Sequence, residues 1–432
     1  MRILELNEQT KTDLSKNLLK RSPNSYGEYE KVVAEIIEQV REKGDEAIFE
    51  YTKKFDKADI NKDNILVTEN EIKEAYEAVD QTLLSVIRKS LVNIKKYHEK
   101  QLQNSWFTSE DGIILGQKVS PMNIAGVYVP GGKAVYPSSV LMNVLPAKVA
   151  GVPRIVMCTP CDANGKVYPS TLVAAKEAGV DEIYKCGGAQ AIAAMAFGTE
   201  SVPKVDKIVG PGNIFVALAK KAVFGFVSID SIAGPSEILV LADETANPRY
   251  VAADLLSQAE HDEMASAILI TTSKELAENV SKEVDGFVAV LSRKEIIQKS
   301  LDQYGYILVA DNMQDAIDAA NTIASEHMEI VTKDPFTIMT KIKNAGAIFL
   351  GEYSSEPLGD YFAGPNHVLP TNGTAKFFSP LSVDDFIKKS SIISYSREAL
   401  EAVYQDIATF ADCEQLTAHA NSIRVRFEDK ES

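Results

Sequence analysis

Apolar residues recur at helical spacing from the start of the chain to about residue 110. One run places apolar side chains three or four positions apart: Val32, Val33, Ile36, Ile37 and Val40. Thr68 followed by Glu71 is typical of a helix capping box. The positions after it predict one long amphipathic helix: Ile72, Ala75, Val79, Leu83, Ile87, Leu91 and Ile94. We expect His98 to lie in solvent at the end of that helix.

Short apolar runs alternate with helical stretches from about residue 112 onward. The first set predicts strands at 124–129, 154–159, 182–186 and 207–209, and helices at 140–150, 170–178, 189–197 and 213–224. The second set predicts strands at 237–242, 267–272, 306–309, 328–331 and 347–350, and helices at 249–258, 274–284, 293–304, 313–324 and 335–344. Such alternation is typical of parallel sheets with crossover helices. We therefore predict an α/β fold of two tandem Rossmann-like parallel-sheet units, with helical N- and C-terminal segments.

The composition indicates a folded, acidic protein. Of the 432 residues, 45% are hydrophobic and 25% charged, and 61 acidic residues against 45 basic ones give a formal net charge of −16. Because no basic stripe offsets this excess, nucleic acids and anionic membranes are poor partners. No apolar stretch reaches the ~20 residues that span a bilayer, and the first residues lack a signal-peptide pattern. We expect a cytoplasmic protein with no nucleic-acid or membrane partner.

Cys158 and Cys161 form a single CxxC motif. A structural zinc site needs about four ligands, and no second CxxC or nearby histidine completes this one. A redox pair is one interpretation. Two reduced cysteines at the end of a buried strand is the favoured one, because cysteine is among the most often buried residues.

Four of the five histidines lie in the C-terminal half beside carboxylate or amide side chains: His261, His327, His367 and His419. Gln258 and His261, three apart on a predicted helix, would share one face, and Asp360 lies in a Gly/Pro-rich loop that can aim its carboxylate at a ligand. Together with His419 they offer nitrogen and oxygen donors without thiolate, which suits zinc or manganese. Taken singly, a capped helix end or a turn aspartate explains each of them as well.

Glu326 and His327 are adjacent residues of acid–base type. A histidine can take the proton of an alcohol while hydride leaves the same carbon, and a glutamate can activate water. The alternative is a glutamate at a helix end and a histidine at a strand start, with no chemical role. Glu414 and His419, five residues apart, would not share one helix face, so they have different roles or flank a break in the helix.

Glycine-rich turns follow three predicted strands, at 129–132, 186–190 and 209–213. Turns at the carboxyl ends of parallel strands commonly bind ligands, with helix N-termini available for phosphate. None is a complete GxGxxG fingerprint, since Phe215 stands where the third glycine would be. The loops alone leave open both a nucleotide site and simple tight turns.

The chain closely resembles the histidinol dehydrogenases. Residues 229–261 match that family's signature, and other landmarks follow the family's order at 126–132, 187–190, 209–213, 325–327 and 359–367, closing with Glu414 and His419. The resemblance covers essentially the whole chain. It implies a zinc- and NAD-dependent enzyme of histidine biosynthesis that converts L-histidinol through L-histidinal to L-histidine in two successive hydride transfers.

The resemblance also implies residue roles. Glu326 and His327 would be the acid–base residues. One zinc per subunit would be bound by Gln258, His261, Asp360 and His419. NAD would contact Tyr128, Gln190 and Asn213. The substrate site would comprise Ser236, Gln258, His261, His327, Asp360, His367, Glu414 and His419. No covalent intermediate is required, so Cys186 need not be a nucleophile.

The resemblance further implies a homodimer with shared active sites. The expected parts are an N-terminal segment (1–25), a first α/β domain (26–128 with 238–380), a second (129–237) and a C-terminal helical segment (381–432) that reaches the partner. Glu414 and His419 would then serve the other subunit.

Three rival interpretations remain. A related NAD-dependent dehydrogenase of another small alcohol would keep the zinc and NAD residues and alter those that hold substrate, and Ser236 and Glu414 favour histidinol. A zinc hydrolase would need no nicotinamide. A binding protein would not need Glu326 beside His327.

Overall fold

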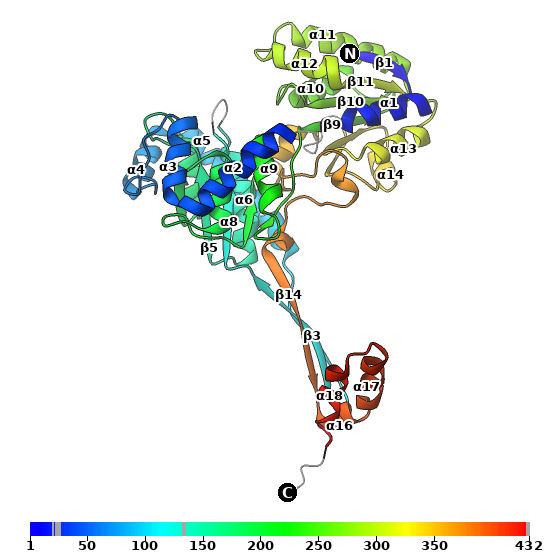
Figure 1. Ribbon diagram of the computed structural model, residues 1–432. Helices are drawn as coiled ribbons and strands as arrows, with labels where there is room; N and C mark the ends of the chain where they lie inside the picture. Colours follow the sequence, from blue (N-terminus) through cyan, green and yellow to red (C-terminus); the bar gives the residue numbers. More distant parts are fainter. Residues whose placement is uncertain (20, 22–26, 132–134, 429–432) are drawn as a thin grey trace. The chain divides into compact units, whose positions relative to one another are not determined.

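The computed structural model describes residues 1–19, 21, 27–131 and 135–428. The chain divides into two compact units, one of Met1–Gln101 with Met122–Phe386 and one of Leu102–Pro121 with the chain from Ile387 onward. The first unit holds two parallel sheets and the second an antiparallel sheet (Figure 1). The predicted α/β class with two parallel-sheet units is confirmed.

The first parallel sheet has six strands in the order β1-β11-β10-β9-β12-β13. These strands are β1 (Arg2–Glu5), β9 (Glu237–Ala242), β10 (Ser266–Thr271), β11 (Gly305–Val309), β12 (His327–Val331) and β13 (Ala347–Leu350). Its helices are α1 (Glu8–Leu19), α10 (Pro248–Ala259), α11 (Lys274–Val288), α12 (Lys294–Tyr304), α13 (Met313–Ile323) and α14 (Pro335–Met339). Ile238 and Val240 pack on the side of α10, α11 and α12, whereas Leu239 and Leu241 pack on the side of α1 and α13 (Figure 1). Both faces are covered, so β9 is apolar along its length after Glu237.

The second parallel sheet has five strands in the order β6-β5-β4-β7-β8. They are β4 (Ile124–Tyr128), β5 (Arg154–Thr159), β6 (Glu182–Lys185), β7 (Lys207–Val209) and β8 (Ser228–Ile229). Its helices are α6 (Pro137–Ala150), α7 (Pro169–Ala178), α8 (Gly188–Phe197) and α9 (Ile214–Val223). An outer helical layer packs on these: α2 (Gly27–Lys43), α3 (Asp45–Phe55), α4 (Glu69–Ala78) and α5 (Gln81–His98). Helices α6 and α8 are consequently apolar on nearly every side.

The second unit consists of the antiparallel sheet β14-β3-β2 and three short helices. Its elements are β2 (Trp106–Glu110), β3 (Ile113–Pro121), β14 (Ile387–Tyr395), α16 (Arg397–Glu401), α17 (Tyr404–Cys413) and α18 (Thr417–Arg424). The prediction of a helical segment over 381–432 is wrong at its start, where β14 forms. Most of the side chains of β14 are exposed, so its sequence lacks the alternation that marks a half-buried strand.

Every strand predicted between residues 124 and 350 is present, but β1 was not predicted. All four residues of β1 are exposed, and the strand exists because it pairs with β11, with Arg2 opposite Tyr306. The predicted long helix over 72–94 is two helices, because Val79 is extended (ψ 133°) and Asp80 caps α5 by accepting from the amide of Thr82 at 2.5 Å.

The expected placement of His98 in solvent is also wrong, because its side chain is fully buried. Its ring nitrogens lie 2.7 Å from Gln101 Oε1 and 3.3 Å from Asn366 Nδ2. Burial lowers the pKa of His98, so the ring is neutral and supports the chain just before His367.

The sheets group the chain differently from the expected boundaries. Strand β4, expected with 26–128 and 238–380, lies at the centre of the five-stranded sheet, and α2 to α5 cover the helices of that sheet. Residues 2–5, expected in a separate segment, form an edge strand of the six-stranded sheet. Residues 20 and 22–25 of that segment lie outside the described residues.

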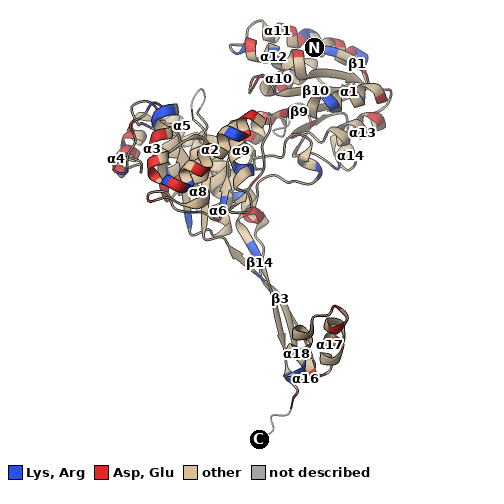
Figure 2. Ribbon diagram, in the orientation of Figure 1, with Lys and Arg blue, Asp and Glu red and all other residues tan. Residues whose placement is uncertain are grey.

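Acidic and basic residues are intermixed on helices α2 and α3 (Figure 2). In the described part of the chain, no helix combines the length and the apolarity needed to cross a membrane.

Candidate active site

Glu326 and His327 lie at the amino end of β12, and both contact Glu237 at the amino end of β9. The Glu237 amide donates to Glu326 Oε2 at 2.8 Å, and the Glu326 amide donates to Glu237 Oε2 at 3.3 Å. His327 Nδ1 lies 3.0 Å from the Glu237 carbonyl oxygen. Because a carbonyl only accepts hydrogen bonds, Nδ1 carries the proton when the ring is neutral and Nε2 has the free lone pair.

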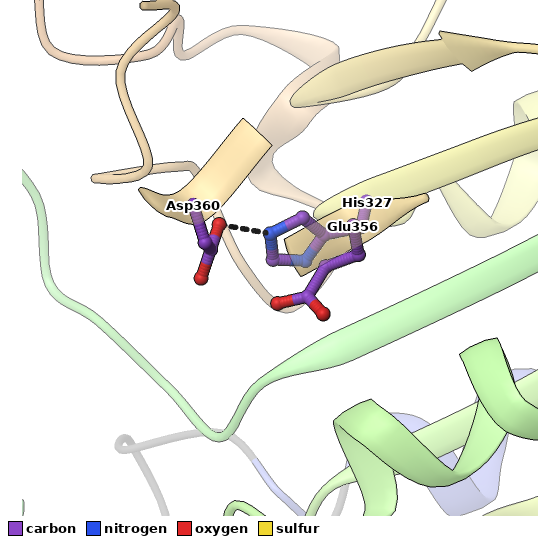
Figure 3. Close-up of side chains that lie close together, drawn as sticks. All are labelled: His327, Glu356 and Asp360. Carbon is purple, nitrogen blue, oxygen red and sulfur yellow. Dashed lines mark ion pairs between the residues drawn. The ribbon is translucent and has the colours of Figure 1, made fainter. Parts of the chain in front are cut away.

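His327, Glu356 and Asp360 form a compact cluster (Figure 3). One ligand-type atom from each lies within 4.8 Å of the others, and His327 Nε2 is 3.5 Å from Asp360 Oδ1. Glu356 begins the short helix α15 (Glu356–Leu358), and Asp360 lies in the π-helical turn η3 (Gly359–Ala363) that follows. An imidazole nitrogen and two carboxylate oxygens in a mostly buried position are a donor set suited to a divalent cation.

The turn that carries Asp360 is fastened to helix α5. Ser90 Oγ donates to the Tyr361 carbonyl at 2.7 Å, and Asn93 Nδ2 donates to the Phe362 carbonyl at 2.8 Å. The five-stranded sheet and its helices therefore hold Asp360, while the six-stranded sheet holds His327.

His367 connects the same turn to helix α6. Its Nδ1 lies 3.1 Å from the Asp360 carbonyl oxygen, and its Nε2 lies 3.3 Å from Ser139 Oγ. The carbonyl fixes the proton on Nδ1, so Nε2 accepts from the serine hydroxyl. Next to it, Asn366 Nδ2 donates to the Met142 carbonyl at 2.6 Å. Burial lowers the pKa of His367 despite the nearby Asp360 carboxylate, so the ring is neutral near pH 7.

Gln258 and His261 lie at the carboxyl end of α10. The helix ends at Ala259, so His261 occupies the following turn rather than the helix, and its amide donates to the Gln258 carbonyl at 3.2 Å. Gln258 is almost completely buried, yet neither Oε1 nor Nε2 has a hydrogen-bond partner among the described residues. A buried amide without partners costs about 1–3 kcal/mol, so this side chain fits a metal or substrate ligand better than a structural role.

His261 is electrostatically coupled to the cluster. Desolvation lowers its pKa, and the charge of Asp360 opposes that shift. The residue as a whole is exposed in the described chain. Among the described residues, the compact cluster itself is formed by His327, Glu356 and Asp360 and does not include His261.

Burial and charge set the protonation of the acid–base pair. Burial raises the pKa of Glu326 to about 8, even though His327 lowers it. Burial by itself would lower the pKa of His327, but the carboxylates of Glu326 and Asp360 outweigh it and raise the pKa to about 10. For Asp360, the hydrogen bond and charge of His327 outweigh burial and hold the pKa at about 2. His327 and Asp360 therefore form an ion pair, with the proton on the imidazole.

Two further carboxyl groups, those of Glu329 and Asp254, are linked to Glu356 by hydrogen bonds. Ser257 Oγ donates to Glu356 Oε2 at 3.0 Å, and the Glu356 amide donates to Glu329 Oε1 at 2.8 Å. Asp254 is hydrogen-bonded in turn to Glu329, and burial raises the pKa of both carboxyl groups. Burial also raises the pKa of Glu356, to about 7.

Tyr128 and Gln190 both lie near Gly188, at the carboxyl edge of the five-stranded sheet. The Gly188 amide donates to Tyr128 Oη at 3.0 Å. Gly188 has a φ of +64°, and a Cβ there would lie 2.8 Å from Gln190 Oε1, so the turn requires glycine. Gln190 Oε1 is buried and has no hydrogen-bond partner within the described ranges. An unpartnered acceptor at a helix N-terminus fits a ligand-binding turn.

Asn213 caps helix α9 on the same edge. Its Oδ1 accepts from the amides of Phe215 and Val216 at 3.1 and 3.3 Å. The turn before it is held by the buried Lys220–Asp230 ion pair: Lys220 Nζ donates to the Gly210 carbonyl at 3.0 Å, and Asp230 Oδ2 accepts from the Gly210 amide at 2.8 Å. Gly132, in the third glycine turn, lies outside the described residues.

Comparison with known proteins identifies the family. The family model described as histidinol dehydrogenase matches residues 19–427. A histidinol dehydrogenase of Bacillus subtilis is 59% identical over 410 residues, covering 94% of this chain and 96% of the relative. One of Caldanaerobacter subterraneus subsp. tengcongensis is 58% identical over 407 residues, 94% of each.

The chain belongs to the histidinol dehydrogenase family. It is accordingly an oxidoreductase, and the predicted enzyme class is confirmed. The crystal structure of a histidinol dehydrogenase from Elizabethkingia anophelis has the same fold, with a TM-score of 0.91, 37% identity and coverage of 100% of this chain and 99% of that one.

Two predicted site residues lie in the second unit. Glu414 follows the last residue of α17, and His419 lies within α18. Of the two interpretations of their spacing, a break in the helix is present, and Gln415 there has a φ of +62°. Both side chains are exposed. The remaining predicted residues of this histidinol dehydrogenase family member lie in the first unit.

Sequence reasoning missed Glu237, Glu356 and Ser139. The sequence did contain a signal for Glu237, because a glutamate begins an otherwise apolar strand directly after Ser236. Ser236 is partly buried, and its carbonyl accepts from the amide of Ser266 at 3.0 Å. Glu356 and Ser139 had none, because their roles depend on contacts with distant segments. Cys158 and Cys161 are free, buried thiols, as the favoured interpretation held.

Proposed function

We propose that this protein oxidises L-histidinol through L-histidinal to L-histidine, passing two hydrides in succession to NAD. The observation that carries the proposal is the buried Glu326–His327 pair, in which His327 Nδ1 faces the Glu237 carbonyl and Nε2 is turned toward Asp360. Family membership supports the substrate, because the similar proteins are named for it. The net reaction consumes histidinol, water and two NAD⁺, and yields histidine, two NADH and three protons.

His327 is the proposed base for both oxidations. Its Nε2 takes the hydroxyl proton of the alcohol as hydride leaves the adjoining carbon, while the Glu237 carbonyl keeps Nδ1–H in place. Glu326 then removes a proton from the water that adds to the aldehyde, and His327 acts again on the hydrated aldehyde. Holding the aldehyde in this site protects it from side reactions.

Gln258, His261 and Asp360, together with His419 of the partner subunit, are the proposed zinc ligands. The unpartnered amide of Gln258 and the coupling of His261 to Asp360 support this set. Zinc bound there would supply a fixed point for the imidazole and amino nitrogens of histidinol. Ser236, His367 and Glu414 of the partner subunit are the proposed further contacts to substrate.

Tyr128, Gln190 and Asn213 are the proposed contacts to NAD. Support comes from their common position at the carboxyl edge of a parallel sheet, where α8 and α9 begin. Helix N-termini favour the negative charge of a pyrophosphate, and NAD accepts the hydride. The buried, unpartnered Gln190 Oε1 is an acceptor that a ligand could satisfy.

We also propose a homodimer whose second unit completes the site of the partner. In this unit large apolar side chains are exposed, among them Phe107, Ile393, Phe410 and Val425. Exposed apolar side chains at this density favour a protein interface. Burial against a second copy would remove them from water and bring the exposed Glu414 and His419 to a site.

The decisive measurement is the yield of NADH per histidinol consumed, followed at 340 nm with and without a chelator. We expect a ratio of two, and we expect the reaction to stop when the chelator removes the metal. A ratio of one would indicate a simple alcohol dehydrogenase. Histidinol binding without NADH would indicate a binding protein.

The shared site is tested by mixing two inactive variants. His261→Ala and His419→Ala change different units, so a mixed dimer would retain one intact site. Partial recovery of activity on mixing supports sharing. Confirmed mixed dimers with no recovery would refute it.

A further inference from the structure

The side chain of Arg21 is completely buried and uses all its donors. Nη1 donates to Glu237 Oε1 and Ser266 Oγ, both at 3.0 Å, and Nε donates to the Met264 carbonyl at 2.6 Å. Nη2 donates to the carbonyls of Pro235 and Ser236 at 2.9 and 3.0 Å. A guanidinium has five N–H groups, and each has an acceptor here, of which only Glu237 is charged.

Arg21 therefore fixes the main chain from residue 235 to residue 237 and the side chain of Glu237. It contacts neither Glu326 nor His327. Glu237, by contrast, touches both through separate atoms: its amide and Oε2 bond to Glu326, and its carbonyl bonds to His327 Nδ1. Any displacement of Glu237 thus changes the position of Glu326 and the tautomer of His327 together.

The charge of Arg21 is as important as its hydrogen bonds. Glu237 and Glu326 are both buried, and the carboxyl group of each accepts from the backbone amide of the other. Arg21 Nη1 is the cation that pairs with Glu237. Removing one partner of a buried ion pair is strongly destabilising, because it leaves an uncompensated charge. Without Arg21, the 235–237 segment would lose two carbonyl anchors, and Glu237 would move away from the acid–base pair.

We propose that Arg21 is a positioning residue of the active site, which acts through Glu237 to hold Glu326 and His327 in their working arrangement. The proposal rests on the acid–base roles given above to Glu326 and His327. Arg21 has this role although it lies more than two hundred residues before Glu237 in the sequence.

The test compares Arg21→Met, Arg21→Lys and the double variant Arg21→Met/Glu237→Gln with the wild-type enzyme. We expect Arg21→Met to lower kcat about 100-fold, the cost of misplacing a catalytic group by about 1 Å, with little change in the KM for histidinol. Arg21→Lys keeps the charge and should lose less. The double variant removes the uncompensated carboxylate, so it should be more active than Arg21→Met alone.

Lys207→Met is the matched control. Lys207 is also buried and pairs with a carboxylate, Asp385, at 2.9 Å, but it lies at the amino end of β7 on the five-stranded sheet. We expect it to lower the melting temperature and leave kcat nearly unchanged. If Arg21→Met fails to fold, Arg21→Lys is compared with Lys207→Met in its place.

Two results would overturn the inference. One is a wild-type kcat in a folded Arg21 variant. The other is a fall in melting temperature and kcat that matches Lys207→Met, with no gain in the double variant. Failure of the proposed function would look different, because the wild-type enzyme itself would then form no NADH from histidinol.

Discussion

The two parallel sheets carry the residues proposed to be functional at opposite edges. On the five-stranded sheet, Tyr128 ends β4, and the turns with Gln190 and Asn213 follow β6 and β7, so these residues lie at the carboxyl edge. On the six-stranded sheet, Glu237 begins β9 and His327 begins β12, so the acid–base pair lies at the amino edge.

Helix direction gives this difference a physical meaning. Helices α8 and α9 begin at the carboxyl edge of their sheet, where the helix dipole favours an anion such as pyrophosphate. Helices α10 and α13 end at the amino edge of theirs, just before His261 and Glu326. Helix C-termini favour cations, so this edge suits zinc. Helix direction is therefore consistent with the NAD and zinc sites proposed above.

The largest expected effect comes from His327→Asn at the amino edge. Asparagine can still donate to the Glu237 carbonyl but cannot take a proton, so we expect kcat to fall about 10³-fold, within the usual contribution of an acid–base group. Zinc content and melting temperature should stay near wild-type values. A kcat close to wild type would remove His327 from the mechanism.

Gln258→Leu tests the proposed zinc site. Loss of a ligand should weaken zinc binding at least about tenfold. Mutating a residue that only hydrogen-bonds to a metal ligand already lowers metal affinity by about that factor. Without metal, the variant should be more stable than the wild-type enzyme, because leucine replaces a buried amide that has no hydrogen-bond partner. Metal content by elemental analysis and denaturant midpoints with and without chelator measure the two effects. Lower stability of the metal-free variant would contradict this reading of Gln258.

Asn213→Ala tests the proposed NAD site. Loss of the cap on α9 should cost about 1 kcal/mol of stability and raise the KM for NAD, with a smaller effect on kcat. Asn247→Ala is the matched control, because Asn247 caps α10 in the same way, accepting from the Arg249 amide at 3.0 Å. Equal stability losses with an NAD effect only in Asn213→Ala would support the assignment, and equal KM values would oppose it.

The smallest expected effect concerns the pH dependence of stability that comes from Asp254, one of the carboxyl groups linked to Glu356. Burial raises the pKa of Asp254 to about 6, above its value of about 4 in an unfolded chain. The folded chain then holds a proton that the unfolded chain releases, so this contribution to stability is present below about pH 4 and is lost by pH 6. We expect Asp254→Asn to flatten the decline in denaturant midpoint between these values. An unchanged slope would show that Asp254 titrates normally.

Much of the fold followed from local pattern, and the exceptions share a cause. The strands from β4 to β13, except the two-residue strand β8, were predicted because apolar runs in a doubly covered sheet are visible in the sequence. Strands β1 and β14 have mostly exposed side chains, so only their pairing with distant strands creates them. The break between α4 and α5 was missed because apolar residues continue at helical spacing on both sides of Asp80.

The acid–base pair, the glycine turns and the break before His419 could all be located from the sequence, since residue type and family motif are local properties. Tertiary structure alone decided that Glu237 holds both Glu326 and His327, that Ser139 faces His367, and that Arg21 reaches the strand carrying Glu237. These contacts join segments far apart in the chain. Their strength comes from burial, which no short stretch of sequence encodes.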